Sequence, residues 1–172
     1  MVPKAGQLAP DWMLESHLGS RVRLSDFRGK RHVVMAFFPL AWTPVCTSQI
    51  PSYQAVLDRF ERMQVQVLGL SVDSVPCLVA WAESLGGITY PLLSDFYPHG
   101  AVAQLYGVLR PDGKSERAIF VIDKQGIIRY VDVHDIDKQP DRDVLFAELE
   151  KLEPAAAAII KAAESAAAQE VK

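Results

Sequence analysis

The stretch RHVVMAFFPLAWTPVCTSQIPSY, residues 31–53, places one of the two cysteines of the chain shortly after a continuous apolar run. Residues 31–38 are rich in β-branched and aromatic side chains, which favours a strand buried on both faces, and Pro39 ends the run. Beyond Cys46, apolar residues recur at spacings of three and four, which predicts a helix over about residues 47–62. The apolar positions are Ile50, Tyr53, Leu57 and Phe60. Cys46 is therefore expected at a turn between a buried strand and a helix.

A second strand and helix follow in the same order. Residues 66–72, QVLGLSV, predict a strand, and residues 74–87 predict a helix that stops at the Gly86-Gly87 pair. Residues 117–133 predict two strands joined by a glycine-containing turn. Strands that alternate with helices, followed by a hairpin, predict an α/β three-layer sandwich with a mixed central β-sheet flanked by helices.

The two ends of the chain are predicted as additions to this core. Turn signals at Gly19-Ser20 favour a small accessory hairpin near the N-terminus. A last helix is expected before Pro154, and the residues after this proline are rich in alanine and other helix formers. We therefore expect one domain over residues 1–153 and an alanine-rich helical tail over residues 154–172.

Composition limits the classes of partner. The chain has 172 residues, 49% of them hydrophobic, and a formal net charge of -3, which favours a small molecule or a protein partner over nucleic acid or an anionic membrane. The N-terminal residues lack the apolar core of a signal peptide, and no segment approaches the roughly 18 apolar residues of a membrane span. With two cysteines rather than a disulfide framework, we expect a cytoplasmic protein whose thiols are buried, catalytic or redox-active.

The predicted position of Cys46 favours reactivity. Ligands bind outside the carboxyl ends of parallel strands, where helices begin, and a thiol in the first turn of such a helix faces unpaired N–H groups and the positive end of the helix dipole. Both favour the thiolate, which is the reactive form. The turn also has the shape of the thioredoxin W-C-x-x-C motif with Thr43 in place of the first cysteine, so no disulfide can close across it. Pro39 is expected to shield the pocket from water.

The segment PLAWTPVC resembles the peroxiredoxin signature P-x-x-x-(T/S)-x-x-C at Pro39, Thr43 and Cys46. Further landmarks follow the family order over roughly residues 3–150: LSDFRGK, VVMAFFP, CTSQ, LGLSVDS, PLLSD, RAIFVID and GIIRY. The chain is thus identified as similar to peroxiredoxins of the alkyl hydroperoxide reductase C and thiol-specific antioxidant superfamily. The bacterioferritin-comigratory (Q-type) and one-cysteine E-type bacterial groups are the most similar.

This resemblance implies a thioredoxin-like fold and a thiol-dependent peroxidase without a cofactor. Cys46 would attack hydrogen peroxide or an alkyl hydroperoxide and become a sulfenic acid, while the Thr43 hydroxyl binds the peroxide. Arg117, at the head of RAIFVID, matches the arginine that the family places beside the cysteine. Gln49 matches a position that orients this arginine. Trp81 matches an aromatic position that often flanks the pocket, although a core tryptophan is the simpler interpretation.

Several alternatives remain open at this point. Cys77 is a possible resolving residue that would form a disulfide with Cys46; alternatively, it is structural and the enzyme uses one cysteine. The reductant is expected to be thioredoxin or a similar thiol, and the protein a monomer or homodimer. A peroxide-responsive redox sensor is an alternative function, whereas a disulfide oxidoreductase is disfavoured by Thr43.

Two other features are expected to play no part in the chemistry. The four histidines show no spacing typical of a metal site, so no metal is expected. The charged segment DVHDIDKQPDRD, residues 132–143, is expected to form a solvated loop.

Overall fold

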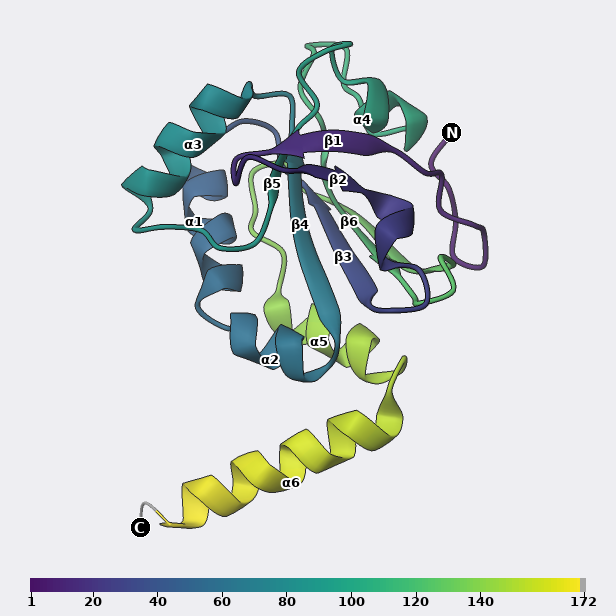
Figure 1. Cartoon of the computed structure of the whole chain (residues 1–172), viewed down its shortest axis with the longest axis vertical. Coiled ribbons are helices and arrows are strands. Elements are labelled where there is room, and N and C mark those ends of the chain that lie inside the picture. Colours follow the sequence, from purple (N-terminus) through teal and green to yellow (C-terminus); the bar gives the residue numbers. More distant parts are fainter. Residues whose placement is uncertain (171–172) are drawn as a thin grey trace.

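A computed structural model describes residues 1–170, and their strands form a mixed seven-stranded sheet (Figure 1). The strands are β1 (Met13–Ser16), β2 (Arg21–Arg23), β3 (His32–Phe37), β4 (Val65–Ser71), β5 (Leu92–Ser94), β6 (Arg117–Ile122) and β7 (Ile128–His134). Their order is β2-β1-β5-β4-β3-β6-β7. Strands β3, β4 and β5 are parallel to one another, whereas β1, β2, β6 and β7 each pair antiparallel with their neighbours. The predicted mixed sheet is confirmed.

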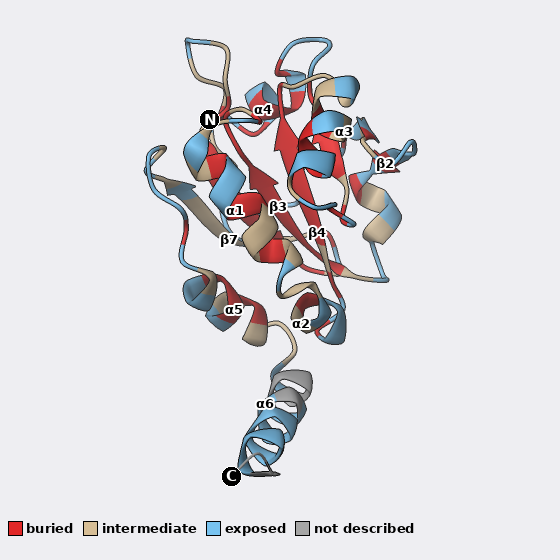
Figure 2. Ribbon diagram, turned by 90° about the vertical axis from the view of Figure 1, so that its left-hand side faces the viewer, coloured by how far each residue is buried: buried red, intermediate tan, exposed pale blue. Residues whose placement is uncertain are grey.

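Helices cover both faces of this sheet. They are the 3-10 helix η1 (Leu24–Phe27) and the α-helices α1 (Pro44–Gln54), α2 (Leu57–Arg62), α3 (Val75–Ser84), α4 (Ala101–Leu105), α5 (Arg142–Glu150) and α6 (Pro154–Glu170). Figure 2 looks onto the face that carries α1, α2, α3 and α5, while η1 and α4 pack on the other face. The predicted three-layer sandwich is therefore confirmed.

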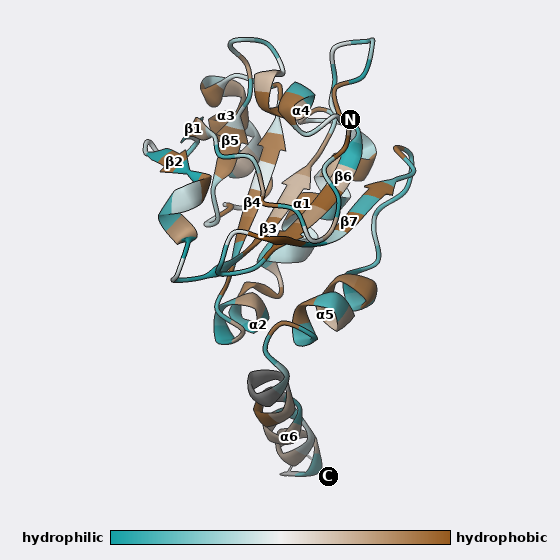
Figure 3. Ribbon diagram, turned by 90° about the vertical axis from the view of Figure 1, so that its right-hand side faces the viewer, coloured by the Kyte–Doolittle hydropathy of each residue, from teal (hydrophilic) through white to brown (hydrophobic). Residues whose placement is uncertain are grey.

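Strand β3 shows how the sequence supplies both faces of the sheet. Successive side chains of a strand point to opposite faces, and every residue of β3 is buried. Val34 and Ala36 pack with α1 and α3, whereas Val33, Met35 and Phe37 pack with η1 and α4. The central strands are accordingly hydrophobic along much of their length (Figure 3).

The predicted N-terminal hairpin is present, but it is not a separate accessory element. Strands β1 and β2 pair antiparallel, and β1 also pairs with β5 through Glu15↔Ser94 and Ser16↔Leu93. The hairpin thereby extends the central sheet. Its pairing with β5 is a long-range contact, which turn signals in the local sequence do not reveal.

The single helix predicted over residues 47–62 is wrong in two respects. Helix α1 begins at Pro44, because proline suits the first helical position, where no N–H bond is needed. Pro51 lies inside α1 and cannot donate to the preceding turn, and the helix ends at Gln54 before α2 starts at Leu57. The predicted apolar face survives this break, since Ile50, Tyr53 and Phe60 are buried and Leu57 packs against them.

Gly69 leaves room for side chains of the neighbouring segments. A Cβ atom at this position would lie 2.8 Å from Leu92 Cδ2 and 3.3 Å from Phe38 Cε1, whereas Ile50 Cδ1 of α1 would be at an ordinary contact distance of 3.7 Å. A larger residue would therefore displace Leu92 of β5 and Phe38, the residue before Pro39.

Helix α6 extends away from the sheet (Figure 1). It contacts the body through ion pairs of Lys161 with Glu150 and of Glu164 with Arg62, and Ile159 is 71% exposed. The helical tail predicted over residues 154–172 is helical up to Glu170, and its last two residues lie outside the described part of the chain. The division into a domain and a tail stays a prediction. Among the described residues, no helix is long and apolar enough to cross a membrane.

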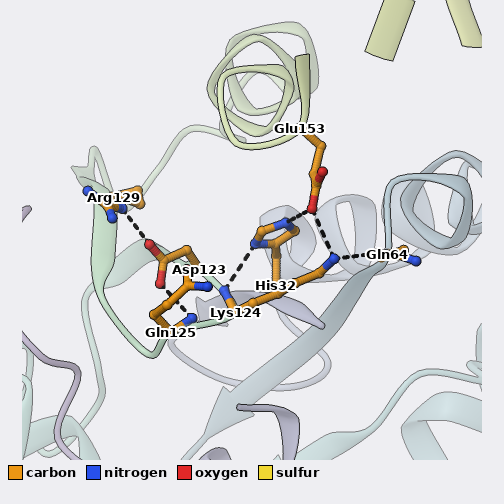
Figure 4. Close-up of polar contacts among 7 residues, drawn as sticks. All are labelled: His32, Gln64, Asp123, Lys124, Gln125, Arg129 and Glu153. Carbon is orange, nitrogen blue, oxygen red and sulfur yellow. Dashed lines mark hydrogen bonds and ion pairs between the residues drawn. The ribbon is translucent and has the colours of Figure 1, made fainter. Parts of the chain in front are cut away.

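A buried histidine joins three segments at the end of the sheet opposite to Cys46 (Figure 4). His32 Nδ1 accepts the Lys124 N–H at 3.2 Å, so the neutral ring carries its proton on Nε2 and donates to Glu153 Oε1 at 3.0 Å. The same carboxylate accepts from Lys124 Nζ at 2.9 Å. His32, to which the sequence assigned no role, therefore links the start of β3 to the junction of α5 and α6.

Acidification is expected to weaken this link. Hydrogen bonds from Lys124 and His32 lower the pKa of Glu153 from 4.5. A carboxyl group whose folded pKa is lowered stabilises the fold above its unfolded pKa and loses this contribution as the pH falls through the folded value. In urea unfolding at a series of pH values, the wild-type free energy of unfolding should therefore fall more steeply below about pH 5 than that of Glu153→Gln. Parallel curves for the two proteins would contradict this assignment.

Candidate functional site

Strands β3, β4 and β6 have ends that lie side by side at one end of the sheet. The parallel strands β3 and β4 both end there, and β6 begins there because it runs antiparallel to β3, with Phe37 opposite Ala118. Arg117, the first residue of β6, is thereby brought to the turn that follows β3. The Ser115 hydroxyl donates to the Phe38 carbonyl at 3.0 Å and ties the two segments together.

The turn before α1 is held by its own hydrogen bond. The Thr43 hydroxyl donates to the Leu40 carbonyl at 2.7 Å, which leaves the lone pairs of the hydroxyl oxygen as acceptors. Between them, Trp42 has a φ of 71°, in the left-handed region that is uncommon for a bulky residue. Pro44 then starts the helix. The sequence Trp-Thr-Pro thus sets the direction in which α1 leaves the sheet.

Cys46 lies in the first turn of α1, and its side chain is fully buried. As the third helical residue, it belongs to the turn whose N–H groups have no acceptor within the helix. Arg117 Nη1 donates to Cys46 Sγ at 3.4 Å. The sulfur therefore lies next to a positive charge and in the N-terminal turn of a helix.

The Arg117 guanidinium is itself positioned by neutral groups. Its Nη1 donates to Gln49 Oε1 at 2.6 Å, and Nε and Nη2 donate to the Ile136 carbonyl at 3.0 and 2.9 Å. Gln49 Nε2 in turn donates to the Tyr53 hydroxyl at 3.1 Å, and burial raises the pKa of Tyr53 to about 12, so the phenol stays neutral. In the described part of the chain, Arg117 donates to the Ile136 carbonyl, the Gln49 amide and the Cys46 sulfur. Of these acceptors, the sulfur is the one that can become an anion. Arg117 is thus a buried cation whose other hydrogen-bond acceptors are neutral.

The segment after β7 contributes to this site, in contrast to its predicted role as a solvated loop. Many of its side chains are exposed, but the backbone of Ile136 turns inward to Arg117, and Pro140 is buried. Gln139 contacts Ser48 and Ser52 on α1. The charged residues therefore mark the outer side of the segment. In the sequence, only the apolar Ile136 and Pro140 indicated that this segment packs against the site.

A pocket of about 180 Å³ lies between the turn before α1, Arg117 and the segment after β7. Its walls are Pro39, Leu40, Thr43, Pro44, Val45, Lys114, Arg117, Ile136 and Asp137. Five of these residues are apolar, while Thr43, Lys114, Arg117 and Asp137 supply polar or charged groups. A larger pocket of about 570 Å³ lies between β1, the start of α3 and Phe96-Tyr97. Neither lining contains a cysteine, but Thr43 and Arg117 line the smaller pocket.

Trp81 does not line this pocket. It is fully buried on α3, and its ring centroid lies 5.2 Å from that of Phe38, next to Pro39. It therefore acts as a core tryptophan that supports the end of β3, in line with the simpler of the two interpretations from the sequence.

Cys77 has a different environment from Cys46. It lies in the first turn of α3, is partly exposed, and donates its S–H to Asp73 Oδ1 at 3.7 Å. Burial and the Asp73 carboxylate raise the pKa of the Cys77 thiol. Both cysteines are free thiols in this structure. Among the described residues, no group of three histidine, cysteine or acidic side chains could hold a metal ion.

The chain is similar to known proteins over most of its length. Residues 5–131 match the AhpC/TSA family. Alkyl hydroperoxide reductase E of Mycobacterium tuberculosis is 40% identical over 136 residues, which cover 78% of this chain and 86% of that protein. The chloroplastic 2-Cys peroxiredoxin BAS1 of Hordeum vulgare is 35% identical, with 78% and 68% covered. The reduced 2-Cys peroxiredoxin of Plasmodium vivax superposes with a TM-score of 0.79 at 33% identity, with 86% of this chain and 81% of that chain covered.

Cys77 is expected to be a slow nucleophile near neutral pH, because its raised pKa lowers the fraction of thiolate. In Cys46→Ser, where Cys77 is the remaining cysteine, the rate of alkylation by iodoacetamide should reach half its maximum at a higher pH in the folded protein than in urea. Equal midpoints, or a lower midpoint in the folded protein, would contradict the environment described for Cys77.

Proposed function

Since the chain belongs to the AhpC/TSA family of peroxiredoxins, it is a thiol-dependent peroxidase, and we propose that Cys46 is the thiol that attacks the peroxide. The observation that carries this proposal is the contact of 3.4 Å between Arg117 Nη1 and Cys46 Sγ, together with the pocket that Arg117 lines. The thiolate forms an S–O bond to the terminal peroxide oxygen while the O–O bond breaks. Cys46 becomes a sulfenic acid, and the departing hydroxide or alkoxide takes up a proton to give water or an alcohol.

In this proposal, three groups bind the two peroxide oxygens. Arg117 keeps Cys46 anionic and donates to the oxygen on which negative charge develops. The Cys46 N–H lies in the first turn of α1 and is a second donor. The Thr43 oxygen accepts from the peroxide O–H, because its own proton is given to Leu40. Gln49 acts through Arg117 and is a positioning residue.

The pocket supports a small substrate. Its volume of about 180 Å³ and its walls of Pro39, Leu40, Pro44 and Val45 suit hydrogen peroxide and small alkyl hydroperoxides. Pro39 is buried and, with its apolar neighbours, keeps bulk water from the thiolate. No prosthetic group is required by this mechanism, since the sulfur itself is oxidised and reduced.

The family implies a thiol reductant, and we propose thioredoxin or a similar protein that attacks the Cys46 sulfenic acid directly. Direct attack is supported by the environment of Cys77, where burial and Asp73 disfavour the thiolate. The external thiol forms a mixed disulfide with Cys46 and releases water, and a second thiol then reduces the disulfide. The competing route is a Cys46–Cys77 disulfide.

We further propose a monomer or a homodimer in the cytoplasm. A reducing compartment fits two free thiols, one of which must return to the reduced state after each turnover. Size-exclusion chromatography at two concentrations tests the assembly, and a decamer would contradict it.

The activity is tested with the reduced protein, hydrogen peroxide, thioredoxin, thioredoxin reductase and NADPH. Wild type should consume peroxide through many turnovers, whereas Cys46→Ser should consume none above background. Unchanged consumption by Cys46→Ser would refute the assignment of Cys46. A single turnover that then stalls would point to a redox sensor, which the peroxidase relatives do not favour.

The route of reduction is tested by intact mass after one equivalent of peroxide, with a sulfenic-acid trapping reagent in a parallel sample. Direct reduction predicts a trapped adduct on Cys46 with Cys77 still free. Loss of two hydrogens from the monomer, absent in Cys77→Ser, would instead establish the Cys46–Cys77 disulfide.

Replacement of Arg117 should slow the first step. Arg117→Met removes the charge beside the sulfur, and we expect the second-order rate constant of Cys46 with hydrogen peroxide to fall about 100-fold or more. Arg117→Lys keeps a charge but cannot reach Cys46, Gln49 and the Ile136 carbonyl together, so an intermediate rate is expected. Stopped-flow mixing with limiting peroxide measures the constants. A wild-type rate in Arg117→Met would exclude the proposed role.

A further inference from the structure

Asp73 lies outside the pocket lining, but its carboxylate joins three segments around it. Oδ2 accepts the Ala41 N–H at 2.8 Å and the Ser71 hydroxyl at 2.7 Å. Oδ1 accepts the Cys77 S–H at 3.7 Å. The carboxylate thus connects the turn before α1 with the end of β4 and the first turn of α3. The attack on peroxide proposed for Cys46, Thr43 and Arg117 assigns no role to Asp73.

The bond to Ala41 has a direct consequence for Thr43. The Ala41 N–H and the Leu40 carbonyl belong to one planar peptide group, so they cannot rotate independently. Asp73 holds the N–H end of this group, and the Thr43 hydroxyl donates to its carbonyl end at 2.7 Å. Donation of the N–H to an anion also polarises the carbonyl and makes it a better acceptor. The orientation of the Thr43 hydroxyl is therefore linked to the Asp73 carboxylate.

The next residue shows why this peptide group needs an external partner. Trp42 has a φ of 71°, a strained value for a non-glycine residue, and its side chain is 56% exposed. Such a conformation persists when the surrounding contacts hold it in place. The hydrogen bond from Ala41 to Asp73 is one such contact, immediately before the strained residue.

We propose that Asp73 is a positioning residue for peroxide reduction: it fixes the Leu40–Ala41 peptide group, which orients the Thr43 hydroxyl so that its oxygen faces the peroxide. This inference rests on the function proposed for Cys46 and Thr43. Asp73 has no contact with the substrate in this arrangement. Its effect on the reaction passes through the backbone of the turn.

The test compares rate constants of Cys46 with limiting hydrogen peroxide in a double-mutant cycle. The proteins are wild type, Asp73→Ala, Thr43→Val and the double variant. Misplacement of a group in an active site can cost up to about 100-fold in rate, and Asp73→Ala should fall within this range. In the Thr43→Val background the hydroxyl is absent, so Asp73→Ala should have little further effect.

Two further variants separate positioning from a loss of stability. Asp73→Asn keeps an oxygen that can accept the Ala41 N–H, and it should recover most of the wild-type rate. Asp123→Ala is the matched control, because Asp123 accepts the backbone N–H groups of Gln125 and Ile127 at the far end of the sheet (Figure 4). It should lower the urea midpoint of unfolding while leaving the rate constant unchanged.

The possible outcomes are distinguishable. If wild type consumes peroxide but Asp73→Ala reacts as fast, or if Asp73→Ala costs the same factor with and without the Thr43 hydroxyl, the positioning role is refuted and the peroxidase function stands. If Asp123→Ala slows the reaction as much as Asp73→Ala, the effect is one of general stability, and the inference is overturned. If wild type itself fails to react, the proposed function fails first.

Discussion

A buried guanidinium group that faces a buried sulfur is the constraint around which this structure is arranged. Removing Arg117 from water is costly, and its other acceptors are a carbonyl and an amide, which carry no charge. The remaining acceptor of Arg117 in the described part of the chain is the Cys46 sulfur, 3.4 Å away. The surroundings of the two groups follow from this requirement: strand β6 brings the arginine to the edge of the sheet, and helix α1 presents the cysteine in its first turn.

The two cysteines have similar positions in the fold but opposite neighbours. Each lies in the first turn of a helix that follows a parallel strand. Cys46 accepts a hydrogen bond from the Arg117 guanidinium, whereas Cys77 donates to the Asp73 carboxylate, which with burial raises the pKa of the Cys77 thiol. The helix N-terminus is common to both, so the charge of the nearest side chain distinguishes the two sites.

Much of the architecture could be predicted from local sequence patterns. The buried run of β3, the hairpin of β6 and β7, and the position of Cys46 after Pro39 each depend on neighbouring residues, so the sequence alone indicates them. Pro51 indicates the break between α1 and α2, but the apolar periodicity continues across it and predicts a single helix. The pairing of β1 with β5 joins residues that are far apart in the chain, and no local signal specifies it. At the site, Arg117 and Gln49 were indicated by the resemblance to peroxiredoxins. The contributions of Ile136 and Ala41 come from backbone atoms, which every residue has, and are therefore invisible to motif analysis.

The backbone origin of the Ile136 contact has a consequence for how this protein can vary. Because a main-chain carbonyl holds the guanidinium, this contact does not itself use the side chains of residues 135–138. The length of the segment is not free, since a deletion or insertion would move the carbonyl away from Arg117. A region that looks like a tolerant surface loop in composition thus has a fixed length, and related sequences should differ there in residue type far more readily than in the number of residues.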